Sequence, residues 1–139
     1  MQEVTVLWLL VAGVSIALAS EVVKRLRQRR ASDLSDEEFV NLYRQRFDGE
    51  ASAIVKERKF IAKCLGLNHL KLRPDDRFHE LSKLSGFDTE YQLGMSNLED
   101  QLFELFQQAG IQPPTQFPST IGELISKLAS VKKTLREPN

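Results

Sequence analysis

The pattern of apolar and polar positions divides the chain into an uncharged N-terminal stretch and a series of amphipathic segments. From Val4 to Ser20, seventeen residues pass without a charged side chain. As a helix rising ~1.5 Å per residue, this run spans ~25 Å, the short end of the range for crossing a bilayer. Five basic residues follow it: Lys24, Arg25, Arg27, Arg29 and Arg30. Because basic flanks stay in the cytoplasm, residues 1–30 are predicted to be a single-pass membrane anchor with the amino terminus outside and the soluble domain cytoplasmic.

Two alternatives to this anchor follow from the same residues. Ala17-Leu18-Ala19 matches the small-x-small pattern of a signal-peptide cleavage site. A signal peptide carries its positive charges before the apolar run, however, whereas here they follow it, which favours an uncleaved anchor. The other alternative is a helix buried in the core of a soluble protein.

Residues 31–49 are predicted to form a linker and one extra helix. Ser35 and Glu38 have capping-box spacing, in which each side chain bonds the other residue's backbone N–H. Apolar side chains then recur at every fourth position, at Phe39, Tyr43 and Phe47. We therefore expect a helix near residues 36–47, ended by Asp48-Gly49.

Residues 50–139 continue with helical periodicity. A segment ending at Gly66 places Ile54, Ile61 and Leu65 on one face. Its opposite, solvent-exposed face is expected to carry Lys56, Arg58, Lys59 and Lys63. Short helical turns are expected between Phe78 and Gly86.

The last third of the chain predicts two longer helices. One has an apolar face formed by Leu98, Leu102, Leu105 and Ala109 and ends at Gly110. The other begins at a second capping-box spacing, Thr120 to Glu123. No stretch alternates long enough to predict a strand. The sequence therefore predicts an all-α protein, a small helical bundle preceded by the extra helix and the anchor.

Composition and charge exclude several classes of function. Nineteen Lys and Arg balance nineteen Asp and Glu, so no net charge points to nucleic acid. Cys64 is the only cysteine, which excludes an intrachain disulfide and a four-thiolate metal site. His69 and His79 lack the spacing of zinc motifs, and no G-x-S-x-G elbow or phosphate-binding glycine loop is present. We expect neither catalysis nor a metal.

Several segments taken together resemble the acyl carrier protein family over about residues 53–130. A helix ends in Cys64-Leu65-Gly66-Leu67, and Phe78 follows thirteen residues after Leu65 within Pro74-Asp75-Asp76-Arg77-Phe78. These match the family's "LG", long loop and "DDSF". Further on, Gly110-Ile111-Gln112-Pro113 matches "x-I-x-P", and Thr120-Ile121-Gly122-Glu123-Leu124 matches the "TVGDL" that opens the last helix.

The resemblance implies three principal helices and one short one, with Leu65, Phe78, Ile111 and Ile121 in one core. It also implies carriage of acyl groups on 4'-phosphopantetheine. The family attaches this arm to the Ser of "G-x-D-S-L" at the start of the second principal helix.

This attachment serine is replaced in either register that the sequence allows. If Leu93–Leu98 overlays the motif, Asn97 occupies the attachment position; if Ser85-Gly86-Phe87-Asp88-Thr89 overlays "D-S-L-D-T", Gly86 occupies it. In each register a serine, Ser96 or Ser85, lies one residue earlier. Either could be an atypical attachment site, while Ser96 also suits a helix N-cap and Ser85 a turn.

The charges are unevenly distributed along the soluble part. No Lys or Arg occurs between Leu84 and Ser126, whereas six acidic residues do. The resemblance implies that an acidic second helix docks basic patches on acyl-processing enzymes, and the candidate docking residues are Glu99, Asp100 and Glu104. A merely solvated acidic face is the alternative.

The leading hypothesis is a membrane-anchored, acyl-carrier-like docking module without the usual phosphopantetheine serine and without a cofactor. The first alternative is a working carrier that uses Ser96 or Ser85. The second is an unrelated helical scaffold that tethers a protein partner to the membrane.

Overall fold

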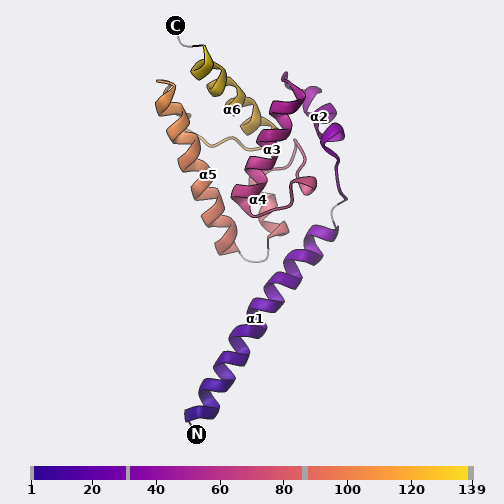
Figure 1. Cartoon of the computed structure of the whole chain (residues 1–139), viewed down its shortest axis with the longest axis vertical. Coiled ribbons are helices and arrows are strands. Elements are labelled where there is room, and N and C mark those ends of the chain that lie inside the picture. The colour runs from indigo at the N-terminus through magenta and orange to yellow at the C-terminus, as the bar shows by residue number, and fades with distance from the viewer. Residues whose placement is uncertain (1, 31, 86–87, 138–139) are drawn as a thin grey trace.

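The computed structural model describes residues 2–30, 32–85 and 88–137, and within them the chain is all-α (Figure 1). It has six α-helices and two short 3₁₀-helices, and no strand among the described residues. They are α1 (Gln2–Arg30), α2 (Asp36–Arg44), α3 (Ala51–Leu65), η1 (His69–Lys71), α4 (Phe78–Leu81), η2 (Ser82–Leu84), α5 (Asp88–Gln108) and α6 (Ile121–Arg136).

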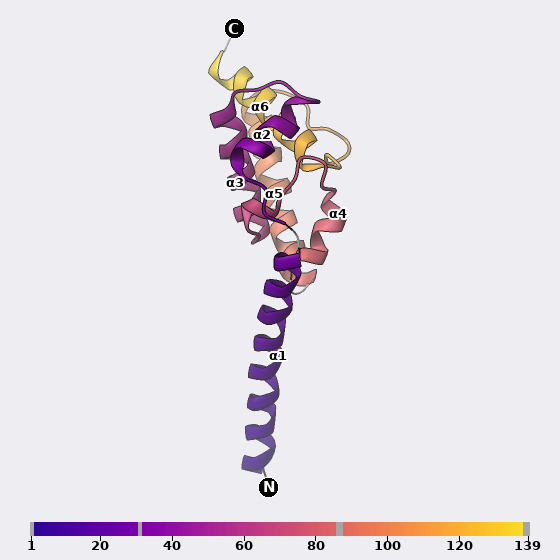
Figure 2. The same ribbon diagram turned by 90° about the vertical axis from the view of Figure 1, so that its right-hand side faces the viewer.

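Helix α1 projects from the bundle as a single long rod, visible from two directions in Figures 1 and 2. Residues Gln2–Val23 are long and apolar enough to cross a membrane, and none of the most apolar part is buried in the protein. Trp8, for example, is 69% exposed. The alternative of a buried core helix is therefore wrong, and α1 has the properties of a single membrane span or a signal sequence.

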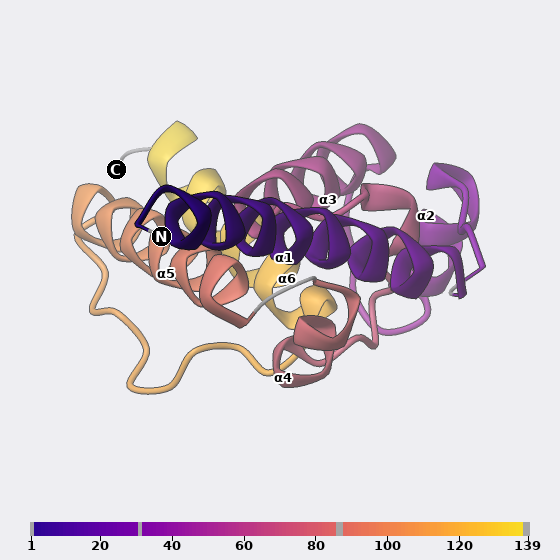
Figure 3. The same cartoon turned by 90° about the horizontal axis from the view of Figure 1, so that it is seen from below.

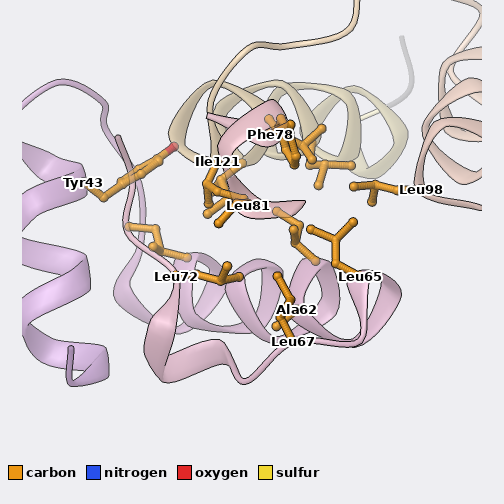
Figure 4. Packing of buried hydrophobic residues seen from close by; sticks show 14 of the residues in the cluster. Tyr43, Ala62, Leu65, Leu67, Leu72, Phe78, Leu81, Leu98 and Ile121 are labelled. Carbon is orange, nitrogen blue, oxygen red and sulfur yellow. The ribbon is translucent and has the colours of Figure 1, made fainter. Parts of the chain in front are cut away.

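Helix α3 lies at the centre of the bundle, in contact with α2, α5 and α6, and α5 also packs on α6. The apolar faces predicted from helical periodicity meet in one core (Figure 4). Leu65, Phe78 and Ile121 are buried there, and Ile111 is half-buried against them. The four positions that the resemblance assigns to one core thus share it.

Helix α2 begins as predicted and ends one turn early. The reciprocal Ser35–Glu38 capping box is formed, with N···O distances of 3.2 and 3.4 Å. The helix stops at Arg44, whose guanidinium donates two hydrogen bonds to the carbonyl oxygen of Gly49 and so fixes the turn that follows. Phe47 lies beyond the helix but still stacks on Tyr43, with ring centroids 5.1 Å apart. Phe47 therefore follows Tyr43 at a four-residue spacing because both rings pack together, and not because the helix continues to Phe47.

The loop before α4 is tied to the start of α6 by backbone hydrogen bonds. Ile121 N–H donates to the carbonyl oxygen of Asp76 (3.0 Å), and Gly122 N–H to that of Pro74 (2.9 Å). A Cβ at Gly122 would lie 3.1 Å from the Pro74 oxygen, so glycine permits this approach. Thr120 caps α6 by accepting from Glu123 N–H, while the Glu123 carboxylate accepts from Ser119 rather than from Thr120.

Arg58 was expected on the exposed face of α3, and this expectation is wrong: its side chain is fully buried. The guanidinium donates to the carbonyl oxygens of Leu34 (2.8 Å) and Leu72 (3.0 Å) and to Asp36 Oδ1 (2.9 Å). It also lies over the ring of Phe39, 4.4 Å from the centroid. The segment before α2 folds over this face of α3 and converts a basic surface position into an internal one.

Replacing Arg58 by Met is expected to destabilise the domain strongly. The substitution leaves two buried carbonyl oxygens and Asp36 without their donor, which should lower the free energy of unfolding by about 3 kcal/mol. Denaturant unfolding of the full chain in detergent, followed by circular dichroism, measures the change. The control is Lys59→Met, one position along α3 with a side chain 55% exposed, which should change the free energy by less than ~0.5 kcal/mol. Equal effects of the two substitutions would contradict the assignment.

Candidate functional site

Helix α5 carries the candidate residues that the sequence singled out, apart from Ser85. The helix is continuous from Asp88 to Gln108, so Ser96 lies in its third turn and not at its start. The N-cap interpretation of Ser96 is therefore wrong, and the segment Leu93–Leu98 does not open a helix. Ser96 and Asn97 are both exposed, and Asn97 accepts a hydrogen bond from Gln101 (3.2 Å).

Ser85 follows η2 directly and is only 1% exposed. Its backbone N–H donates to the carbonyl oxygen of Ser82, as expected of a turn residue. Gly86, the attachment position in the second register, lies outside the described residues. A transferase could reach the Ser85 hydroxyl only if this part of the bundle opened.

Two close contacts fix the N-terminal half of α5 against the rest of the bundle. The buried hydroxyl of Tyr91 donates to the carbonyl oxygen of Phe78. At Gly94, a Cβ would lie 2.5 Å from the carbonyl oxygen of Cys64 and 3.1 Å from Leu65 Cα, so only glycine allows α5 to approach the end of α3 so closely.

The half-buried Cys64 lies at this junction, where Gln101 Nε2 is 3.9 Å from its sulfur. Burial raises the pKa of the Cys64 thiol, an effect that Lys63 partly opposes. Cys64 is therefore a protonated packing residue rather than an activated nucleophile.

The two histidines lie next to separate carboxylates. His69 Nε2 is 3.9 Å from Asp36, and His79 Nε2 is 3.8 Å from Glu80. Among the described residues, no group of three or more His, Cys, Asp or Glu side chains could hold a metal ion.

The outward face of α5 is acidic. Glu99, Asp100 and Glu104 are all exposed, and no side chain that the structure describes forms an ion pair with them. The predicted docking residues therefore share one accessible face, and their charges are not neutralised by neighbours. An acidic surface of this kind attracts positively charged partners.

Sequence reasoning missed two apolar side chains on the same outward face. Leu93 is 69% exposed and Phe103 is 49% exposed. Both fall outside the apolar stripe of Leu98, Leu102, Leu105 and Ala109. Their positions in the sequence therefore already indicated that they are not on the buried face. The face thus combines carboxylates with large apolar side chains, the combination typical of protein-binding surfaces.

Comparison of the chain with protein-family models, with curated proteins and with solved structures finds no match.

The tyrosine that holds α5 gives the fold a specific dependence on alkaline pH. Burial raises the pKa of Tyr91 to about 12, from 10.0, and also raises the pKa of Tyr43, the other tyrosine. Below pH 10 both phenols are protonated in the folded and unfolded chain, so the stability is fully present. Between pH 10 and 12 the phenol of Tyr91 loses its proton in the unfolded chain but keeps it in the folded chain, so stability falls as pH rises, by about 2–3 kcal/mol for this residue.

Tyrosinate absorbance and the helical circular dichroism signal are followed together through this pH range. The absorbance should rise at the same pH at which the helical signal falls, because the buried phenol ionises when the chain unfolds. Tyr91→Phe should reduce the alkaline loss of stability. Tyrosinate absorbance that rises around pH 10 while the helices persist would show that the phenols are not protected.

Proposed function

We propose that this chain is a membrane-anchored docking module built on an acyl-carrier-like helical bundle, which binds a protein partner and carries no phosphopantetheine arm. The observation that carries the proposal is the outward face of α5, where Glu99, Asp100 and Glu104 are exposed and form no ion pair with any side chain that the structure describes. Acidic side chains held on one rigid helix steer and orient a basic partner surface more effectively than charges on a loop.

The positions of the two serines favour docking over acyl carriage. An attached arm requires an accessible hydroxyl at the start of a helix. Ser85 is buried, and Ser96 lies in the interior of α5. Ser96 is exposed, so it remains the position at which a working carrier would have to be modified.

The acyl-carrier-like part of the proposal is supported by the packing of the bundle. Three long helices, α3, α5 and α6, pack on one another, and short α4 lies between the first two in sequence. The core shared by Leu65, Phe78, Ile111 and Ile121 is the one that the resemblance implies. The absence of any match in the comparisons leaves this resemblance as part of the proposal.

The exposed apolar side chains of α1 support a membrane anchor, in which the apolar run spans the bilayer and the basic flank stays cytoplasmic. The C-terminal end of α1 contacts η2, so the bundle lies close to the membrane surface. Figures 1 and 2 place the N-terminal end of α5 near the end of α1 and its C-terminal end away from it. The part of α5 that carries Glu99, Asp100 and Glu104 thus lies farther from the bilayer than the start of the helix does, and a soluble partner can reach it there.

Neutralising the acidic face should abolish partner binding. The full chain in lipid nanodiscs is used as bait, and bound proteins are quantified for the native chain and for the variant Glu99→Gln, Asp100→Asn, Glu104→Gln. The recovered amount of a defined set of proteins should be about tenfold or more lower with the variant than with the native chain. Rising salt should also weaken the binding of this set to the native chain.

The matched control removes two glutamates and one aspartate that are exposed elsewhere on the surface, through Glu37→Gln, Asp48→Asn and Glu137→Gln. This control should retain the set. If the two variants behave alike, the α5 face is only a solvated acidic surface.

The intact mass of the chain distinguishes the docking module from a carrier and from a cleaved precursor. Protein isolated from membranes should have the mass of all 139 residues, without cleavage after Ala19 and without an added arm. Incubation with coenzyme A and a promiscuous phosphopantetheinyl transferase should leave this mass unchanged. A phosphopantetheine increment abolished by Ser96→Ala or by Ser85→Ala would instead establish a working carrier and identify its site.

A further inference from the structure

A small apolar pocket lies beside the acidic face of α5, with a volume of about 290 Å³. One wall comes from α5 and the other from the connection that leads to α6. Its lining consists of Glu99, Leu102, Phe103, Phe106, Pro113, Pro114 and Phe117. Six of these seven residues are apolar, and the seventh is one of the candidate docking carboxylates.

The loop wall of the pocket is held in place by local structure. Figure 3 shows the connection leaving the far end of α5, running around the outside of the bundle and returning beside α4. Consecutive prolines, Pro113 and Pro114, restrict its backbone. Phe117 is fixed by an edge-to-face contact with Phe78, with centroids 5.1 Å apart and an interplanar angle of 71°. Because the walls are preformed, an occupant need not order them on binding.

The size of the pocket limits what can occupy it. Sites that enclose drug-sized ligands measure roughly 300–1,000 Å³, and this pocket lies just below that range. Phe103, which forms part of the rim, is half exposed in the isolated chain. A pocket of this size beside an exposed aromatic ring suits one large apolar side chain, as at the central anchor of a protein interface.

Charge defines the surroundings of that side chain. Glu99 lines the pocket, and Asp100 and Glu104 lie on the same outward face of α5. No Lys or Arg occurs between Leu84 and Ser126 to neutralise them. The complementary occupant is therefore an apolar residue with Lys or Arg on either side. The chain's own basic segment follows the apolar run of α1, whose end contacts η2 near the opposite end of α5, so the occupant comes from another protein.

We infer that this pocket is the anchor point for a basic, amphipathic segment of a partner protein, which inserts one large apolar side chain between Phe103 and Phe117. This inference rests on the proposed docking function and names the chemistry of the partner. The acidic residues orient the basic segment. The pocket favours segments that have a large apolar side chain at the position that enters it.

The test uses two labelled synthetic helical peptides, identical and rich in Lys and Arg except for a central Leu in one and Ala in the other. Their affinities are measured by fluorescence anisotropy against the full chain in nanodiscs of uncharged lipid. The Leu peptide should bind about tenfold or more tightly than the Ala peptide. In Phe103→Ser this preference for Leu should disappear, because the pocket has lost its outer wall.

Leu42→Ser is the matched control, since Leu42 is also an exposed apolar residue but lies on α2, away from the acidic face, and does not line the pocket. The preference for Leu should survive in this variant, and circular dichroism should show unchanged helix content in both. The pocket inference would be overturned if the native chain bound the two peptides equally, or if the two variants lost the preference for the Leu peptide to the same extent.

The variant with neutralised Glu99, Asp100 and Glu104 separates the two proposals. If both peptides bind the native chain equally and the neutral variant poorly, the docking face stands and the pocket inference fails. If neither peptide distinguishes the native chain from the neutral variant, the docking function itself fails.

Discussion

The fold depends on a positive charge buried in its centre. Burial lowers the pKa of Arg58, the hydrogen bond to Asp36 opposes this effect, and a guanidinium remains charged in any case. The charge is tolerated in the interior only while Leu34, Leu72 and Asp36 supply their oxygens. These three acceptors come from the linker, from the end of η1 and from the first residue of α2. One side chain therefore makes the docking of three segments on α3 interdependent.

Further contacts of the same linker determine how α1 is joined to the bundle. Leu34 is buried, and its N–H donates to the carbonyl oxygen of Leu70 (2.8 Å). Just before it, Ser32 accepts a hydrogen bond from Arg73 (2.7 Å), and Asp33 pairs with Lys71. The linker is thus held to the bundle within a few residues of the end of α1. The proposed docking function benefits from this attachment, because the bundle that carries α5 is held within a few residues of α1.

Local patterns in the sequence predicted local structure well and long-range structure poorly. The Ser35 capping box and the end of α3 at Gly66 depend on neighbouring residues, and both are found as expected; Gly66 ends the helix in the left-handed conformation, with φ of 68°. Arg58 was misassigned because helical periodicity cannot reveal that Asp36, twenty-two residues earlier, folds over it. At Gly94 the local pattern is also misleading. Glycine weakens a helix by its own propensity, but here the close approach of the Cys64 carbonyl oxygen requires it. The pocket was not predicted because Phe103 and Phe117 line it together only as a result of the course of the loop between α5 and α6, which local patterns do not reveal.

The two halves of α5 have different environments, and this difference bears directly on function. The N-terminal half is fixed by Tyr91 on Phe78 and by Gly94 on α3, and neither Ser85, which is buried, nor Ser96, which lies inside the helix, offers an exposed hydroxyl at the helix start. The other half turns its carboxylates and its half-exposed Phe103 to solvent and borders a preformed pocket. In the proposed function, a membrane anchor restricts the chain to a surface and so raises the effective concentration of its partner there. Modest affinity from one apolar anchor and a few charges is then sufficient for recruitment, and a covalent cofactor is not required.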